Sequence, residues 1–233
     1  MNLEDLTDSA QNYLKSLWTL SEWTGGAVTP SEVARHLDLR PSSVSDQIRR
    51  LTLAGLVDHA PYGSVTLTDE GRALALQMVR RHRLAETFLA EMLGYEWDEV
   101  HEDADRLEHA ISEKMLERID AALGHPERDP HGDPIPASDG VLPERSFRPL
   151  VDCSVGECVQ MSRIRDADPA VLRHLGSLGI VPGAEFTVSD AGETSGVMLL
   201  KSGDRGHDVP LARDVAASIR VVPVSAPDEG RED

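Results

Sequence analysis

The stretch RPSSVSDQIRRLTLAGLV, residues 40–57, decides how the N-terminal part of the chain folds. Val44, Ile48 and Leu51 recur at the spacing of one face of a helix, and Gly55 closes the pattern. The stretch therefore predicts a short amphipathic helix that buries one side and exposes its polar residues.

The flanking segments place this helix in a motif. TPSEVARHLDL, residues 29–39, predicts a preceding short helix, because Pro30 suits a first helical turn and a Thr followed by an acid suits a helix start. LVDHAPYGSVTLT, residues 56–68, predicts two β-strands around a turn. Two short helices followed by a hairpin predict a winged helix-turn-helix.

The second helix of such a motif enters the major groove of double-stranded DNA. Small hydroxyls and a glutamine can contact phosphates or base edges, whereas a carboxylate is tolerated only where it meets cytosine. The residues predicted to contact DNA are Arg40, Pro41, Ser42, Ser43, Ser45, Asp46, Gln47, Arg49, Arg50 and, in the hairpin turn, Tyr62. The pattern alone leaves open an ordinary helical hairpin, or a winged helix used for protein contacts.

The composition is that of a globular protein of one or two domains, with 40% hydrophobic and 27% charged residues among 233. No apolar run approaches the roughly 20 residues of a membrane span, and the acidic start MNLEDLTDSAQNYL is not a secretory signal. Cys153 and Cys158 are too few for a disulfide framework and are expected to be reduced. We expect a cytoplasmic protein without a membrane partner.

The formal net charge of −18 opposes binding to nucleic acid, but the charge is unevenly distributed. Residues 35–83 hold eight basic and five acidic residues, whereas residues 96–129 hold twelve acidic and four basic ones. The first segment could face DNA, and the second could face cations.

Further patterns organise the rest of the chain. Helices are expected at residues 8–23, from about 68 to about 93, and from about 97 to 123. Residues 124–149 are rich in Pro, Gly and acid and resemble a linker with turns. Residues 150–223 alternate short Val, Ile and Leu runs with glycines, which predicts a small β-barrel or sheet with one short helix at 168–179.

A possible metal site lies in VHEDADRLEHAIS, residues 100–112. At about 100° per residue, one helical face would carry His101, Asp105, Glu108 and His109. The preceding helix adds His82 and Glu86, four residues apart. Clustered imidazole and carboxylate without thiolate suits Mn(II) or Fe(II), although an acidic run can equally be a solvated helix face.

Five motifs in order, LTDSAQNYLKSLWTLSE, VSDQIRRLTLAGLV, TDEGRALALQMVRRHRLAETFL, VHEDADRLEHAIS and DPHGDPIP, resemble the diphtheria toxin repressor family of metal-dependent regulators. The resemblance covers residues 5–223 and is strongest for the manganese-responsive transport-regulator branch. It implies a mainly α protein with a small β domain. The implied parts are a winged helix-turn-helix (1–72), a helical dimerisation and metal-binding domain (73–140), a linker (141–149), an SH3-like, FeoA-like β-barrel (150–224) and a disordered tail (225–233).

The resemblance also implies two metal sites. The activation site would use Asn12, Asp105, Glu108 and His109, and it leaves open whether His82 or a backbone oxygen joins them. Iron-type members carry Cys where this chain has Asp105, and a hard carboxylate in place of sulfur favours Mn(II). Asn12 departs from the usual Asp of manganese-type members, so this site is expected to be weaker or to need a bridging water.

The second implied site combines His82, Glu86 and His101 with groups from outside the helical pair. Asp129 and His131 match a Cys-Pro-His motif of streptococcal members, and Asp168 falls where the SH3-like domain supplies an acid. Asp168 equally suits a helix N-cap before Pro169.

The function that follows is a repressor with Mn(II) as corepressor, binding palindromic operators as a homodimer to control metal-uptake genes, with no enzymatic activity and no small organic substrate. Without metal, the packed carboxylates would repel one another and leave the DNA-binding domains loosely oriented. Fe(II) is the alternative corepressor, and Co(II) or Zn(II) could substitute in vitro. The rivals are a metallohydrolase, which H-E-x-x-H and an evident general base would have favoured, and a winged-helix regulator of an organic ligand.

Overall fold

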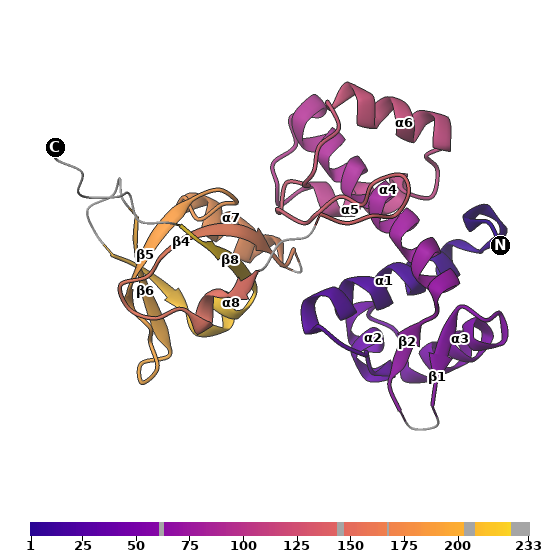
Figure 1. The fold of residues 1–233 in the computed structure, drawn as a ribbon, viewed down its shortest axis with the longest axis horizontal. Coiled ribbons are helices and arrows are strands. Elements are labelled where there is room, and N and C mark those ends of the chain that lie inside the picture. The colour runs from indigo at the N-terminus through magenta and orange to yellow at the C-terminus, as the bar shows by residue number, and fades with distance from the viewer. Residues whose placement is uncertain (61–62, 144–146, 167, 203–207, 225–233) are drawn as a thin grey trace, which may run out of the picture. The chain divides into compact units, whose positions relative to one another are not determined.

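The computed structural model describes residues 1–60, 63–143, 147–166, 168–202 and 208–224 (Figure 1). Tyr62 and the tail 225–233 lie outside the described residues. Two compact units are formed, the first by Met1–Ala85, Ala104–Glu127 and Ile135–Pro143, and the second by Glu86–Asp103, Arg128–Pro134 and the described residues of Glu144–Asp233. The second unit therefore includes the C-terminal part of one long helix, the residues that follow it as far as Asp103, and the loop 128–134. No described helix is both long and apolar enough to cross a membrane.

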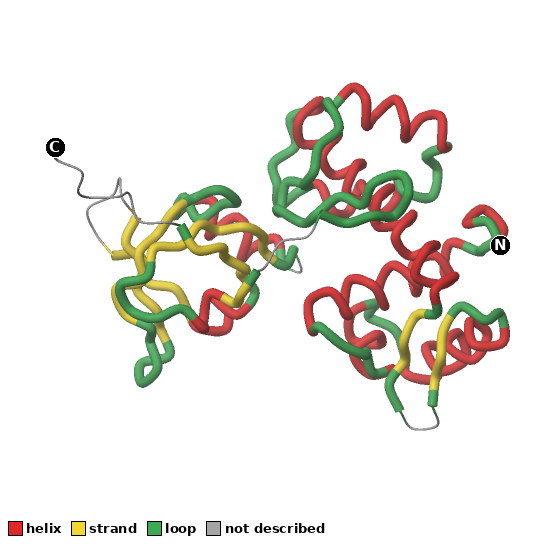
Figure 2. Tube along the Cα trace, viewed as in Figure 1, coloured by secondary structure: helices red, strands yellow, loops and turns green. Residues whose placement is uncertain are grey.

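The first unit begins with a winged helix-turn-helix. Its elements are η1 (Leu3–Asp5), α1 (Asp8–Thr24), α2 (Pro30–His36), α3 (Pro41–Leu53), β1 (Val57–His59) and β2 (Val65–Leu67). β1 and β2 form an antiparallel hairpin, and Val28 adds a bridge to Val65. Figure 2 shows this hairpin beside the three helices. The fold class predicted for this segment is confirmed.

Local sequence explains where these helices begin. Thr7 caps α1 by accepting a hydrogen bond from the Ala10 N–H. Thr29 and Glu32 form a reciprocal capping box at α2. The predicted apolar face of α3 is buried, with Val44 and Ile48 fully inaccessible to solvent. Buried residues of α1, α2 and α3 form one hydrophobic core.

The helical region contains α4 (Asp69–Leu93), α5 (Val100–Leu107) and α6 (Glu113–Ala122). The single helix expected over residues 97–123 is therefore wrong. The chain turns after Leu107, and Ser112 starts a new helix by accepting a hydrogen bond from the Met115 N–H. Glu108 and His109 consequently lie in the turn that follows α5.

The second unit contains a six-stranded antiparallel sheet of order β3-β8-β4-β5-β6-β7 (Figure 2). Its elements are β3 (Arg148–Pro149), η2 (Leu150–Asp152), β4 (Cys158–Ile164), α7 (Pro169–Ser177), β5 (Glu185–Asp190), β6 (Val197–Ser202), β7 (Asp208–Ala212), α8 (Arg213–Ala217) and β8 (Ile219–Pro223). Alternate apolar residues such as Val159 and Met161 form its core.

The loop 128–134 lies against the end of β4. The Ile164 N–H donates to the His131 carbonyl oxygen over 3.0 Å. Gly132 has φ +85°, and a Cβ there would lie 2.0 Å from the Ser162 carbonyl oxygen. Only glycine permits this approach, which fixes the neighbouring His131 beside the sheet.

Candidate metal centres and nucleic-acid interface

The first unit brings three predicted ligands together around a lysine that was not predicted. Lys15, on α1, places its Nζ 2.8 Å from Asp105 Oδ1 and 2.7 and 2.8 Å from the two Glu108 oxygens. His82 Nδ1, from α4, lies 3.3 Å from the same Nζ and 2.6 Å from Glu108 Oε2. We call His82, Asp105 and Glu108 the first centre; their ligand atoms lie within 4.8 Å of one another.

The Glu108 carboxylate depends on its positively charged neighbours in the first centre, because its side chain has no exposed surface. A buried carboxylate is costly unless it is paired and hydrogen-bonded. Burial raises the pKa of Glu108. The hydrogen bond and charge of His82 and the charge of Lys15 lower it by more than burial raises it, so the pKa lies below its usual value. Burial likewise lowers the pKa of Lys15, and the Glu108 and Asp105 carboxylates more than reverse this.

His109 is oriented by a second residue of α1. Its Nδ1 lies 2.8 Å from Gln11 Oε1, whereas its buried Nε2 has no hydrogen-bond partner among the described residues. Asn12 follows Gln11, and its buried Oδ1 also lacks a hydrogen-bond partner in the described part of the chain. Unsatisfied buried donors and acceptors are rare, so both atoms fit ligands for a cation.

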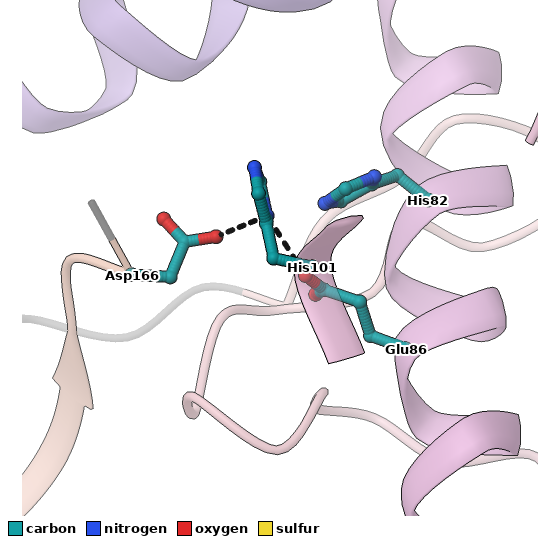
Figure 3. A group of neighbouring side chains, drawn as sticks. All are labelled: His82, Glu86, His101 and Asp166. Atoms are coloured by element: carbon teal, nitrogen blue, oxygen red, sulfur yellow. Dashed lines mark hydrogen bonds and ion pairs between the residues drawn. The ribbon is translucent and has the colours of Figure 1, made fainter. Parts of the chain in front are cut away.

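The second unit contains another group, which we call the second centre: Glu86, His101 and Asp166, which Figure 3 shows, together with His131, which lies beside Glu86. His101 Nδ1 lies 2.9 Å from Asp166 Oδ2 and 3.2 Å from Glu86 Oε1. His131 Nδ1 lies 3.6 Å from Glu86 Oε2. His82 precedes Glu86 by one turn on α4, as its spacing predicted.

His131 is held in one orientation by backbone groups. Its Nε2 donates to the Trp97 carbonyl oxygen over 2.7 Å, and its N–H donates to Asp129 Oδ1 over 2.9 Å. The buried Nδ1 faces Glu86 and has no hydrogen-bond partner among the described residues. A histidine whose other nitrogen bonds a carbonyl is the usual arrangement at metal sites.

The histidines of the second centre supply positive charge when no metal is present. Burial lowers the pKa of His101, but its bonds to Asp166 and Glu86 raise it to about 11. For His131, burial is again outweighed, chiefly by Glu86, and the pKa rises to about 10. Burial would raise the pKa of Asp166, but the hydrogen bond and charge of His101 hold it far below its usual value.

Both centres fit a divalent cation, since each offers buried imidazole and carboxylate and neither contains sulfur. The structure brings together Asp105, Glu108 and His82 in one centre and Glu86 and His101 in the other, and it places Asp129 and His131 beside Glu86. The predicted Asp168 is not in either group.

Asp168 caps α7, with its Oδ1 accepting from the Ala170 N–H over 2.8 Å. The acid that the β domain brings to the second centre is Asp166, which sequence reasoning missed. Two acids lie two residues apart here, and only the path of the chain decides which of them reaches His101.

The predicted DNA-contacting face of α3 is accessible. Arg40, Pro41, Ser42, Ser43, Ser45, Asp46, Arg49 and Arg50 are exposed, and Gln47 is half-buried. Ser45 donates its hydroxyl to the Pro41 carbonyl oxygen, which leaves its lone pairs available as acceptors. The exposed arginines can therefore approach phosphates.

The excess of basic residues in the segment 35–83 overstates the positive charge that is available for DNA at this face. Arg80, Arg81 and Arg83 pair with Asp120, Glu113 and Glu22 respectively within the first unit. The expectation that the whole segment could face DNA therefore needs correction, because these arginines are committed to internal ion pairs.

Comparisons with known proteins match this layout. The model of the N-terminal DNA-binding domain of iron-dependent repressors matches residues 5–65, that of their metal-binding and dimerisation domain matches 68–137, and the FeoA domain matches 148–223. The iron-dependent repressor IdeR of Mycobacterium tuberculosis is 32% identical over 233 residues, covering 94% of this chain and 99% of that protein. The diphtheria toxin repressor of Corynebacterium diphtheriae is 31% identical over 231 residues, covering 94% and 99%. A solved structure of a manganese-dependent transcriptional repressor in complex with manganese is 47% identical, covers 92% of this chain and 100% of that one, and gives a TM-score of 0.87.

Proposed function

Because the chain belongs to the iron-dependent repressor family, whose members include the diphtheria toxin repressor, we propose that Mn(II) is the corepressor of this DNA-binding transcriptional repressor. It binds palindromic operators as a homodimer and represses genes for metal uptake. The resemblance to a manganese-dependent repressor supports the metal, and the matched dimerisation domain supports the dimer.

The observation that carries the choice of metal is the donor set of the first centre. Asp105, Glu108 and His82 offer only oxygen and nitrogen. His109 Nε2 lies 3.5 Å from Glu108 Oε1, and Asn12 on α1 has a buried Oδ1 without a hydrogen-bond partner among the described residues. Hard and intermediate donors without thiolate suit Mn(II). Fe(II) is the second candidate, since a relative that matches this chain over nearly its whole length is named an iron-dependent repressor.

Helix α1 connects the first centre to the DNA-binding helix α3. Gln11 and Lys15 of α1 contact the end of α5, while the buried face of α1 shares a core with Val44 and Ile48 of α3. A bound cation would supply positive charge between the Asp105 and Glu108 carboxylates. α1, held at one end by that centre, would then fix α3, and the two α3 helices of a dimer would meet successive major-groove turns about 34–36 Å apart.

The direct test is operator binding measured by fluorescence anisotropy. A palindromic duplex is first selected from random DNA with Mn(II)-loaded protein, labelled, and titrated with protein in chelator, Mn(II), anaerobic Fe(II) and Mg(II). We expect tight binding with Mn(II) and loss of at least about a hundredfold in affinity with chelator, the upper range of typical allosteric coupling. Equal affinity with chelator and with Mn(II) would exclude the proposal, and a response to Fe(II) alone would favour the iron alternative.

Variants link this response to the first centre. Glu108→Ala and His109→Ala should abolish the Mn(II) response, because they remove a buried carboxylate and an imidazole from the ligand set. Glu117→Ala, an exposed acid on α6, is the matched control and should respond normally. A reporter strain in which the first two variants still repress in manganese would contradict the assignment.

A further inference from the structure

Lys15 occupies the position in the first centre that a cation would take. Its Nζ lies 2.8 Å from Asp105 Oδ1 and 2.7 and 2.8 Å from the Glu108 oxygens. Hard divalent cations bind such oxygens at about 2.0–2.6 Å, so a metal bound to the same three atoms would overlap the ammonium. The ammonium and the metal therefore exclude each other.

The position of Lys15 is specific in this chain. The sequence has only three lysines, and Lys114 and Lys201 are both exposed. The Lys15 side chain is 14% exposed, and its ammonium contacts the Glu108 side chain, which is fully buried. Burial without its partners would be costly for either group, so this is an interaction built into the centre and not a surface ion pair.

The long stem of Lys15 makes displacement feasible. A lysine carries a compact charge on a flexible four-carbon chain, and 14% exposure leaves a route outward from the first centre. The residue also reaches the centre from α1, whereas Asp105 and Glu108 follow from α5 and its end. The contact therefore joins the two segments that the metal is proposed to join.

We propose that Lys15 is a tethered counter-cation that competes with the corepressor metal for Asp105 and Glu108, and thereby raises the metal concentration at which the repressor is loaded. The carboxylates of the metal-free protein are then compensated and do not repel one another. The inference rests on the proposed function in taking Mn(II) as the competing cation.

The test is Mn(II) binding to the full chain, stripped of metal, by isothermal titration calorimetry. Lys15→Met keeps the length of the apolar stem and removes the charge, so the Kd of the first centre should fall by about tenfold or more. Lys15→Arg keeps the charge and should bind no tighter than the wild type. Lys114→Met removes an exposed lysine from α6 and should leave the Kd within about twofold of the wild type.

Thermal unfolding gives a second readout that is independent of DNA. In chelator, Lys15→Met should melt several degrees below the wild type, because Glu108 loses a partner. Saturating Mn(II) should raise its Tm by more than it raises that of the wild type. If Lys15→Met does not fold without metal, Lys15→Gln, which retains a hydrogen-bond donor, replaces it in both measurements with the same expectation.

The outcomes separate this inference from the proposed function. Equal or weaker Mn(II) binding by the Lys15→Met variant, with operator binding by the wild type still dependent on Mn(II), overturns the competition alone. Tighter Mn(II) binding by the variant, with operator binding indifferent to metal, supports the competition and overturns the corepressor role. No Mn(II) binding by either protein overturns both.

Discussion

Gln11 shows how a single residue prepares a ligand without being one. Its Nε2 donates to the carbonyl oxygens of Leu3 and Leu6 over 3.0 and 3.2 Å. The amide is therefore fixed with Oε1 toward His109, so His109 Nδ1 must be the donor in their 2.8 Å contact. With Nδ1 as the donor, Nε2 is the ring nitrogen that can present a lone pair to a metal.

Gln11→Leu should weaken Mn(II) binding at the first centre. The substitution keeps the size of the side chain but frees the His109 ring to rotate or change tautomer, and loss of such an outer partner typically costs about 10–100-fold in metal affinity. Calorimetric titration measures this, with Gln77→Leu, an exposed change on α4, as the control. Affinity unchanged from the wild type would mean that Gln11 does not orient the ligand.

At the scale of elements, helix ends were harder to predict than helix faces. The apolar period of residues 44–51 identified the buried face of α3, because a face is set by local spacing. The wheel that grouped His101 with His109 assumed a helix continuing to 123, but α5 ends at Leu107. Ser112 signals the new start only weakly, since serine is common in many contexts.

The capping box of α2 makes a prediction about stability. Thr29→Ala removes the hydroxyl that accepts from the Glu32 N–H, and the free energy of unfolding should fall by about 1 kcal/mol. Urea unfolding at pH 7 measures it. Hydrogen bonds from Thr29 hold the pKa of Glu32 below its ordinary value, so the reciprocal bond is present at neutral pH and is lost as the pH falls through that lowered pKa.

Thr24→Ala is the matched control, because its hydroxyl donates to the Leu20 carbonyl within α1 and caps no helix start. Its free energy of unfolding should stay within about 0.5 kcal/mol of the wild type. If both threonine variants lose equal stability, the capping box contributes nothing particular.

At the scale of the whole molecule, the sequence predicted the order of parts better than their contacts. The winged helix, the helical region and the β domain follow from local periods and glycine-rich turns, and the matched domains confirm them. Lys15 and Asp166 were missed because nothing in their neighbourhood in sequence marks them. Their roles depend on which chain segments meet, which spacing within one segment cannot reveal.

Asp166 and Asp168 allow this limit to be tested within one loop. Asp166→Asn removes the charge that contacts His101 over 2.9 Å, so the second centre should lose Mn(II) while the first retains it. Asp168→Asn should bind metal like the wild type, because asparagine caps a helix as well as aspartate does. Calorimetry and metal analysis of the dialysed proteins give the stoichiometry. A loss of metal in Asp168→Asn and none in Asp166→Asn would reverse the assignment and make Asp168 the ligand from the β domain.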